Sequence, residues 1–467
     1  SPWLQIYLTA ASFKVLGENT WAGRFPFALC GWLTIGLVYA LIRGVSGQVV
    51  WARFGAFFLA CSVPFLLHAR QCRYYAAGAL LAIFVLLALR RSGGKTPVLA
   101  AASLAALFYL NYLVFFAFVC GLGLAFLALD RRRFTVQQLA LGGAVLAALV
   151  APGLWFFRVG PMVQLLHASA ILRNLGRAGV GLIEFILPLP VLAVLLGRWF
   201  AGKKVAVISG EQYVRFLLAL VAGNVLALAL TPNFYFRYLL HLVPAAAVIL
   251  GWCVYRLWMA QRAAAVLLAL VAGLTNGLNM LPLERYGPNG PSWPGEGATL
   301  PETAVPLRAF ANELRQGYPD VNAGLIQYLN EQARPGDTVL ASYGDLPLQF
   351  YTRLRVLGGF QPVPAQLDPL PEWVISRRRT FLTRDNEVPA AVEWIRRLDL
   401  ERDYDSVALD VPDEPFGNRA DPYYHRFAPP APAYPRVIVC RKKPKAVSAN
   451  LQRNGPDLED RINLPNP

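Results

Sequence analysis

The stretch FRYLLHLVPAAAVILGW (residues 236–252) places an Arg-Tyr pair directly before a long run of apolar residues. A helix crosses the hydrocarbon core of a bilayer with about 20 such residues. We therefore expect a membrane span over 238–256, with Arg237 and Tyr238 at one end of it.

Similar apolar runs follow one another through residues 1–280. The run 97–129 is too long for one span, and Asn111-Tyr112 interrupts it, which favours two short helices with a tight turn. One tilted helix is the alternative reading. The pattern predicts about ten spans, at 26–43, 50–68, 73–89, 97–110, 113–129, 136–157, 179–197, 213–230, 238–256 and 262–280.

The overall composition is that of a membrane protein. Of 467 residues, 56% are hydrophobic and 15% charged, with a mean hydropathy of +0.41, whereas about a quarter of a soluble domain is charged. The net charge of +16 would by itself suggest a nucleic-acid partner. The apolar composition instead predicts membrane lipids as partners and no nucleic acid. It also excludes a soluble single domain, a disordered chain and a secreted disulfide scaffold.

Basic residues are unevenly divided between the loops. Every second loop is basic, and these loops together hold 14 of the 22 Lys and Arg residues of 1–280. The positive-inside rule makes those loops cytoplasmic. We therefore expect a multi-pass membrane protein, with 1–25 and the C-terminal half on the outer side of the membrane.

The N-terminal segment 3–16 is short and apolar with polar positions, which fits an interfacial helix better than a span. An outward-facing start needs a preceding span. We therefore expect that the sequence is truncated and that a helix is missing upstream of Ser1.

The composition changes after residue 280. Pro and Gly crowd the first part of 281–320, which reads as a linker, and 442–467 is polar and reads as a disordered tail. Residues 321–441 predict an α/β domain. Its expected helices are 321–333, 345–352 and 388–398, and its expected strands are 338–342, 372–376, 404–411 and 436–440.

The predicted fold class is therefore a membrane-embedded all-α bundle, 1–280, followed by a small extracytoplasmic α/β domain. The six cysteines show no metal-binding spacing, and no cofactor is required by the sequence. A divalent metal held by His68, His167 or His241 stays open.

Polar side chains gather at the outer ends of the predicted spans, where charges are costly unless they are used or paired. The planar donor fork of Arg suits phosphate oxygens, and Tyr adds a hydroxyl and a ring face. This pattern favours an anion site that binds the phosphate of a lipid. Arginines that only contact lipid headgroups are the alternative. The candidate substrate-binding residues are Arg24, His68, Arg70, Arg73, Tyr74, Arg237, Tyr238 and His241.

Three segments resemble a known superfamily. The opening SPWLQIYLTAASFKVLGENTWAGRFPFALCGWLTIGLVYALIRG (1–44), with its Arg24-Phe25-Pro26, the turn HARQCRYYA (68–76) and FRYLLHLVPAAAVILGW resemble segments of GT-C glycosyltransferases. The most similar branches are the bacterial relatives of protein mannosyltransferases and the aminoarabinose transferases. ARPGDTVLASYGD (333–345) is similar to domains appended to some members.

The resemblance implies transfer of a sugar from a polyprenyl-phosphate donor to a lipid, glycan or protein acceptor. It implies that the protein lies in the bacterial inner membrane and acts at the outer, periplasmic face, where the C-terminal domain also lies. It implies that Arg73 and Arg237 hold the donor phosphate, helped by Tyr74, Tyr238 and Arg70. The family's acidic base lies in a loop that would precede Ser1, so the catalytic residue stays unknown.

Two positions depart from the family pattern. Gln71 replaces a Glu, and His241 replaces a Pro. A lipid-linked-sugar flippase or transporter and a non-catalytic scaffold of the same fold therefore remain alternatives. The sequence does not identify the sugar or the acceptor.

Overall fold

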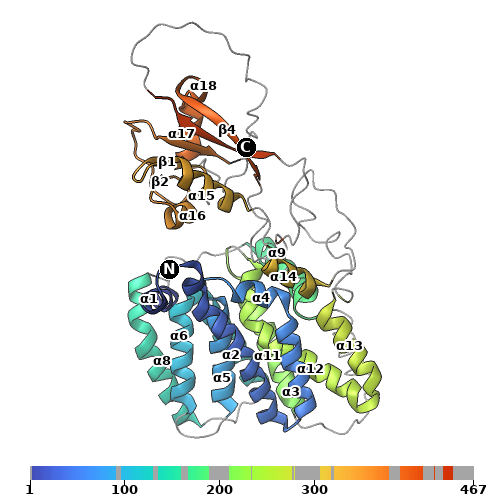
Figure 1. The fold of residues 1–467 in the computed structure, drawn as a ribbon. Coiled ribbons are helices and arrows are strands. Elements are labelled where there is room, and N and C mark those ends of the chain that lie inside the picture. Colours follow the sequence, from blue (N-terminus) through green and yellow to red (C-terminus); the bar gives the residue numbers. More distant parts are fainter. Residues whose placement is uncertain are drawn as a thin grey trace, which may run out of the picture. The chain divides into compact units, whose positions relative to one another are not determined.

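The computed structural model describes residues 3–90, 96–129, 135–158, 167–188, 210–232, 234–275, 278, 305–316, 320–377, 390–413, 425 and 435–444. The chain divides into two compact units, a helical unit within residues 1–312 and an α/β unit that begins at Glu313. Each unit is described by itself (Figure 1).

The helical unit is a bundle of mostly apolar helices with one large core and a smaller cluster around Phe27 (Figure 1). Helix α7 packs along α11, α3 along α12, and α5 between α2 and α6. The helices are α1 (Leu4–Leu16), α2 (Thr20–Ser46), α3 (Val49–Cys61), α4 (Val63–Ala69), α5 (Tyr75–Arg90), α6 (Thr96–Leu110), α7 (Tyr112–Leu129), α8 (Val136–Phe157), α9 (Ala168–Phe185), α11 (Glu211–Ala229), the 3₁₀-helix η2 (Phe236–Leu242), α12 (Val243–Ala260), α13 (Arg262–Leu274) and α14 (Pro306–Arg315).

Only some of these helices are long enough to span a membrane. Among the described residues, five helices are long and apolar enough to cross a membrane, or six if α3 and α4 form one bent span. Helices α1, α5, α6 and α13 are apolar but have only 13 to 16 residues. The structure thus supports a multi-pass helical protein, and the count of ten stays a prediction.

Several boundaries differ from the expected spans. The expected span 50–68 is two helices that meet at an angle of 62°, because Ser62 leaves the helical conformation and Pro64, at the start of α4, has no N–H to donate. Helix α2 begins at Thr20 rather than at Pro26, capped by the side chain of Asn19. The expected break at Asn111 is confirmed, since α6 ends at Leu110 and α7 begins at Tyr112.

Helix α9 begins eleven residues before the expected span 179–197 and ends at Phe185. The remainder of that expected span from residue 189 lies outside the described residues.

Glycines allow two helix pairs to approach closely. A methyl group at Gly121 of α7 would lie 2.2 Å from Asn224 Nδ2 and 2.5 Å from the Leu220 carbonyl oxygen of α11. A methyl group at Gly251 of α12 would lie 2.7 Å from the Gly55 backbone nitrogen of α3. Small residues at crossings are typical of membrane helices, which associate mainly through close packing.

The α/β unit is a five-stranded sheet with helices on both faces. Its elements are α15 (Val321–Gln332), β1 (Thr338–Ala341), α16 (Asp345–Tyr351), β2 (Arg355–Leu357), β3 (Trp373–Ser376), α17 (Ala390–Arg397), α18 (Leu400–Asp403), β4 (Tyr404–Pro412) and β5 (Arg436–Lys442). The strand order is β2-β1-β3-β5-β4. Strand β1 pairs in parallel with β2 and β3, and β5 runs antiparallel to β3 and β4.

Alternation along the strands divides the core of this unit into two layers. Val339 and Ala341 of β1 pack with α15 and α16 on one face, whereas Leu340 packs with α17 on the other. The expected helices and strands of 321–441 are present to within one or two residues at most of their ends. Strand β2 and helix α18 are additional, and α14 lies inside the segment expected to be a linker.

Candidate functional site at the α4–α5 turn

The turn between α4 and α5 carries four of the predicted site residues. His68 is buried, and its Nδ1 lies 2.7 Å from the Pro64 carbonyl oxygen one turn earlier. Its ring also meets Tyr75 edge-on, with the ring centroids 4.9 Å apart. Arg70 ends α4, while Arg73 is exposed on the turn and Tyr74 is half-buried beside it. His68 therefore anchors the turn, and Arg73 and Tyr74 are its accessible members.

The 3₁₀-helix η2 presents the second group. Arg237 is half-buried, and its guanidinium carbon lies 4.2 Å from the centroid of the Tyr235 ring and 5.7 Å from that of Tyr238. The Arg237 and Tyr238 side chains also interact electrostatically. A cation held against aromatic faces keeps its charge while losing part of its water shell.

The two groups come together in the helical unit. Helix α5 packs against η2, and His68 lies 6.2 Å from Phe236, centroid to centroid. Tyr74 and Tyr75 both interact electrostatically with Arg237, and Tyr74 also interacts with Arg73. Two arginines and four tyrosines therefore share one neighbourhood, which can bind an anion through guanidinium and phenol donors.

Helix α1 holds the turn in place through its polar stripe. The Tyr74 backbone N–H donates to Gln5 Oε1 at 3.0 Å, and Thr9 Oγ1 lies 3.0 Å from Cys72 Sγ. Ser12, one further turn along the same face, donates to the Ala22 carbonyl oxygen at 2.5 Å. The helix thus turns Gln5, Thr9 and Ser12 toward the protein, together with Leu4 and Leu8, and leaves Ile6 and Tyr7 exposed.

Two of the predicted site residues lie apart from this cluster. His241 is buried between α7 and α11, with Nε2 2.9 Å from Asn224 Oδ1 and its ring edge-on to Phe118. Arg24 is exposed on α2, and among the described residues no hydrogen bond, ion pair or ring contact joins it to the turn. Arg70 belongs to the turn, and it is half-buried with its guanidinium over the Phe310 ring at 5.4 Å.

Three contributors to the cluster are absent from the sequence-based prediction. Tyr75 and Tyr235 flank the predicted Arg-Tyr pairs, and their aromatic neighbours in the chain are the signal that could have included them. Gln5 contributes a side-chain acceptor to a backbone donor 69 residues away. No local pattern reveals such a contact.

Metal binding finds no support in the geometry of this neighbourhood. Within the described parts of the chain, no three His, Cys, Asp or Glu side chains come together as a metal site would require. The expectation that no cofactor is needed stays a prediction.

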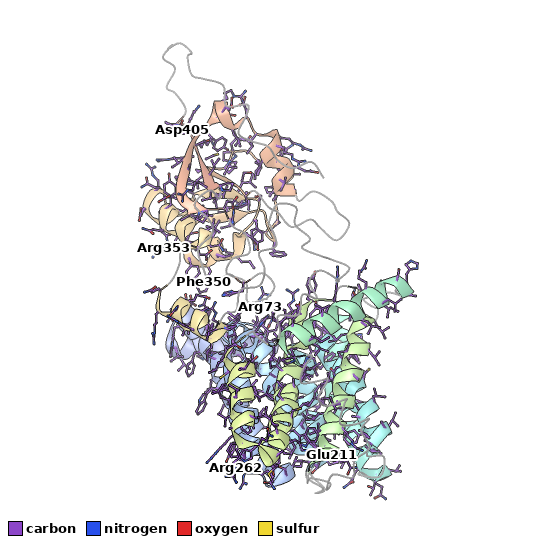
Figure 2. The ribbon with its side chains drawn as sticks, turned by 90° about the vertical axis from the view of Figure 1, so that its right-hand side faces the viewer. Arg73, Glu211, Arg262, Phe350, Arg353 and Asp405 are labelled. Atoms are coloured by element: carbon purple, nitrogen blue, oxygen red, sulfur yellow. The ribbon has the colours of Figure 1, made fainter. Side chains whose placement is uncertain are left out.

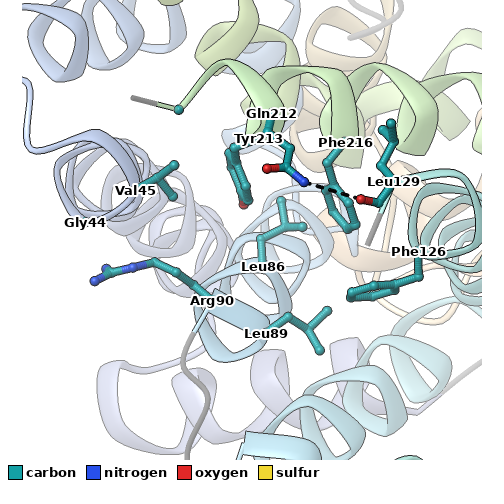
Figure 3. A pocket seen from close by; sticks show the side chains of 11 residues that line it. Gly44, Val45, Leu86, Leu89, Arg90, Phe126, Leu129, Gln212, Tyr213 and Phe216 are labelled. Atoms are coloured by element: carbon teal, nitrogen blue, oxygen red, sulfur yellow. Dashed lines mark hydrogen bonds between the residues drawn. The ribbon is translucent and has the colours of Figure 1, made fainter. Parts of the chain in front are cut away.

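A pocket of about 330 Å³ lies at the other end of α5 (Figure 3). Gln212 Nε2 donates to the Leu129 carbonyl oxygen at 3.4 Å across one wall. Arg73 lies far from this pocket. Figure 2 shows Arg73 at one end of the bundle, and Glu211, between the lining residues Gly210 and Gln212, at the opposite end with Arg262. None of the predicted site residues lines the pocket. Its lining is Gly44, Val45, Leu86, Leu89, Arg90, Phe126, Leu129, Gly210, Gln212, Tyr213 and Phe216.

Comparison with known proteins agrees with the fold. Residues 1–156 match the model of the dolichyl-phosphate-mannose-protein mannosyltransferase family. A comparison with curated protein sequences finds no match. The crystal structure of ArnT from Cupriavidus metallidurans in the apo state aligns with a TM-score of 0.55, and that of ArnT bound to undecaprenyl phosphate with 0.54. Both are 15% identical to this chain, and each alignment covers 94% of this chain and 87% of ArnT.

The family match covers the first third of the chain, and the structural match covers nearly all of it. Residues 1–156 are therefore similar to the dolichyl-phosphate-mannose-protein mannosyltransferase family, and the chain has a fold like that of ArnT.

Proposed function

We propose that this protein transfers a sugar from a polyprenyl-phosphate donor to a lipid, glycan or protein acceptor at the outer face of the membrane. In this reaction the bond between the sugar carbon and the phosphate oxygen breaks, and the polyprenyl phosphate leaves with the electron pair. An acceptor oxygen forms the new bond and loses its proton.

The observation that supports the proposal most is the meeting of Arg73 and Tyr74 with Arg237 and Tyr238. Guanidinium groups stabilise the charge that grows on a departing phosphate. Because Arg237 already lies against Tyr235 and Tyr238, its side chain is held in position before the lipid arrives. In this proposal Arg73 and Arg237 bind the donor phosphate, and Tyr74 and Tyr238 donate to its oxygens. No base is assigned to this chain.

A structure with the same fold supports the lipid class. ArnT from Cupriavidus metallidurans has been crystallised bound to undecaprenyl phosphate. We extend that lipid phosphate to this chain as the donor's leaving group. The sugar and the acceptor stay unassigned.

Activity in membranes tests the proposal. Membranes that contain the protein, incubated with a polyprenyl-phosphate sugar labelled in the sugar, should transfer label to an acceptor. Arg73→Ala and Arg237→Ala should each reduce transfer at least about tenfold, the loss expected for one charge-assisted hydrogen bond in the transition state. Transfer at the wild-type rate by both variants would contradict the assignment.

The alternatives give different outcomes in the same membranes. A flippase would move the labelled lipid across the bilayer without forming a new glycoside. A scaffold would neither move the lipid nor form product. Either result would replace the transferase proposal.

A further inference from the structure

The carboxyl ends of four strands meet at one edge of the α/β unit. Strands β1, β2 and β3 are parallel, and β4 has the same direction because it and β3 both run antiparallel to β5. The residues that follow these strands therefore share an edge: Ser342–Asp345 after β1, Gly358 and Gly359 after β2, Arg377 after β3, and Asp413 after β4.

The chain changes direction across the sheet at this edge. From β1 it passes to β2 on one side and then crosses to β3 on the other side. In α/β sheets, ligands bind outside the carboxyl ends of the strands at such a switch point. Here the point lies between β1 and β3, where Ser342 and Arg377 follow the paired strand ends.

Arg377 is a buried cation with unused donors at this point. It is 1% exposed, its backbone N–H donates to Ser342 Oγ at 2.8 Å, and its Nε donates to Asp413 Oδ1. Its Nη1 and Nη2 atoms are buried and have no hydrogen-bond partner among the described residues. Buried donors without acceptors are costly, and more so on a charged group.

The neighbouring loop lies close to these donors. Gly344 has φ +87°, and a methyl group there would lie 3.4 Å from Nη1 and 3.0 Å from Asn322 Oδ1. Glycine therefore suits both the backbone conformation and the space beside the guanidinium. Asp345, the nearest acidic residue in the loop, already accepts from the Phe360 N–H at 3.1 Å.

We propose that this edge of the α/β unit binds an oxyanion, a phosphate or a carboxylate, through Nη1 and Nη2 of Arg377. The two nitrogens form the planar fork that matches two oxygens of either group. The site also holds two buried carboxylates, Asp345 and Asp413, and each already accepts a hydrogen bond from the protein. It lies wholly in the α/β unit and does not depend on the proposed donor site.

Hydrogen exchange of the whole protein in detergent tests the site. Sodium phosphate or sodium glucuronate at about 20 mM, against sodium chloride of equal ionic strength, should slow amide exchange over 342–345 and at 377 about fivefold, as a millimolar ligand would. Slowing by phosphate alone identifies a phosphate ester as the natural group. Slowing by glucuronate alone identifies a sugar carboxylate, and slowing by both supports the site for either.

Two variants and one control make the test specific. Arg377→Lys keeps a charge for Asp413 but loses the fork, so the slowing should disappear. Should this variant lose protection across β5, the double change Arg377→Met with Asp413→Leu replaces both buried charges and serves instead. Arg402→Gln removes an exposed arginine of the same unit that pairs with Asp403, and it should leave the slowing unchanged. Absence of slowing in the wild type, or equal slowing in the Arg377 variants, would overturn the proposal.

Discussion

Arg237 lies against the Tyr235 ring at 4.2 Å, and it has a counterpart at the other end of the bundle. Arg262 lies over the Trp258 ring at 5.6 Å. Both are arginines on aromatic faces, but only Arg237 interacts with Tyr74 and Tyr75. Comparing variants of Arg237 and Arg262 therefore separates the loss of lipid-phosphate binding from the general effect of removing an arginine at a membrane surface.

Arg237→Ala should weaken binding of undecaprenyl phosphate roughly 10- to 100-fold, since a hydrogen bond to a charged group contributes about 1.5–3 kcal/mol. Titration of the lipid into purified protein in detergent measures the change. The matched Arg262→Ala variant should bind like the wild type. Equal losses in the two variants would mean that the lipid responds to net charge alone.

Tyr235 offers a finer test of the same site, because one substitution removes the whole ring and another removes only its hydroxyl. Tyr235→Leu removes the ring over which Arg237 lies, and a cation–π contact is worth about 0.5–1 kcal/mol at a partly exposed site. The lipid should therefore bind about two- to fivefold more weakly to this variant in the same titration. Tyr235→Phe keeps the ring and should bind normally. A full loss in Tyr235→Phe would assign the effect to the hydroxyl instead.

His241 shows why one predicted residue lies elsewhere. In an α-helix, residues four apart share a face, so Arg237 and His241 would point together. Residues 236–242 form a 3₁₀-helix instead, which has three residues per turn and separates these two positions. His241 therefore packs against Asn224 in the core. The sequence pattern does not distinguish the two helix types over so short a segment.

At the scale of elements, α1 acts on the site only through the turn that it holds. Gln5→Leu removes the acceptor of the Tyr74 N–H, and an unsatisfied buried donor costs about 1–3 kcal/mol. Affinity for undecaprenyl phosphate should fall about fivefold or more, and Gln5→Glu, which keeps the acceptor oxygen, should restore it. Ile6→Ala, on the exposed face of the same helix, is the control. If Gln5→Glu did not restore binding, the hydrogen bond from the Tyr74 N–H to residue 5 would not be what positions the turn.

The crossing of α7 and α11 gives a second prediction at this scale, with a control two residues away. Gly121→Ala would force a methyl group into Asn224 and Leu220, and overpacking costs about 1–3 kcal/mol, or about 5 °C in thermal midpoint. Gly123 of the same helix has nothing within 4 Å, so Gly123→Ala should leave the midpoint unchanged or raise it slightly. Thermal unfolding in detergent measures both. A similar loss in both variants would mean that the loss does not arise from the close crossing of α7 and α11.

Elements with a strong local pattern were predictable, and contacts between elements were not. The short apolar run of β1 and the turn Arg334–Asp337 before it place that strand correctly to within one residue. Strand β2 has only three residues, and its pattern is too short to stand out beside Arg353 and Leu354. The bend at Ser62 is missed because a proline inside an apolar run is common in membrane helices. The unused donors of Arg377 follow only from three-dimensional packing.

For the whole molecule, the distribution of basic loops predicts which end of the bundle faces outward. The structure places Arg73 at one end and Glu211 and Arg262 at the other (Figure 2). Chemical labelling of a cysteine at each end of the bundle measures which end faces outward. Cys72 is exposed on the turn beside Arg73, and Gln261 is exposed between α12 and α13.

In intact cells, a maleimide that cannot cross membranes should label Cys72, because the positive-inside rule places the α4–α5 turn outside. Gln261→Cys, made together with Cys72→Ser, should be labelled only after the inner membrane is opened. Cys120 is exposed at the middle of α7, where a spanning helix would contact lipid, so it should resist labelling in both conditions. If Gln261→Cys were labelled in intact cells and Cys72 of the wild type were not, the predicted topology would be reversed. The proposed lipid-phosphate site would then face the cytoplasm, and transfer at the outer surface would be impossible.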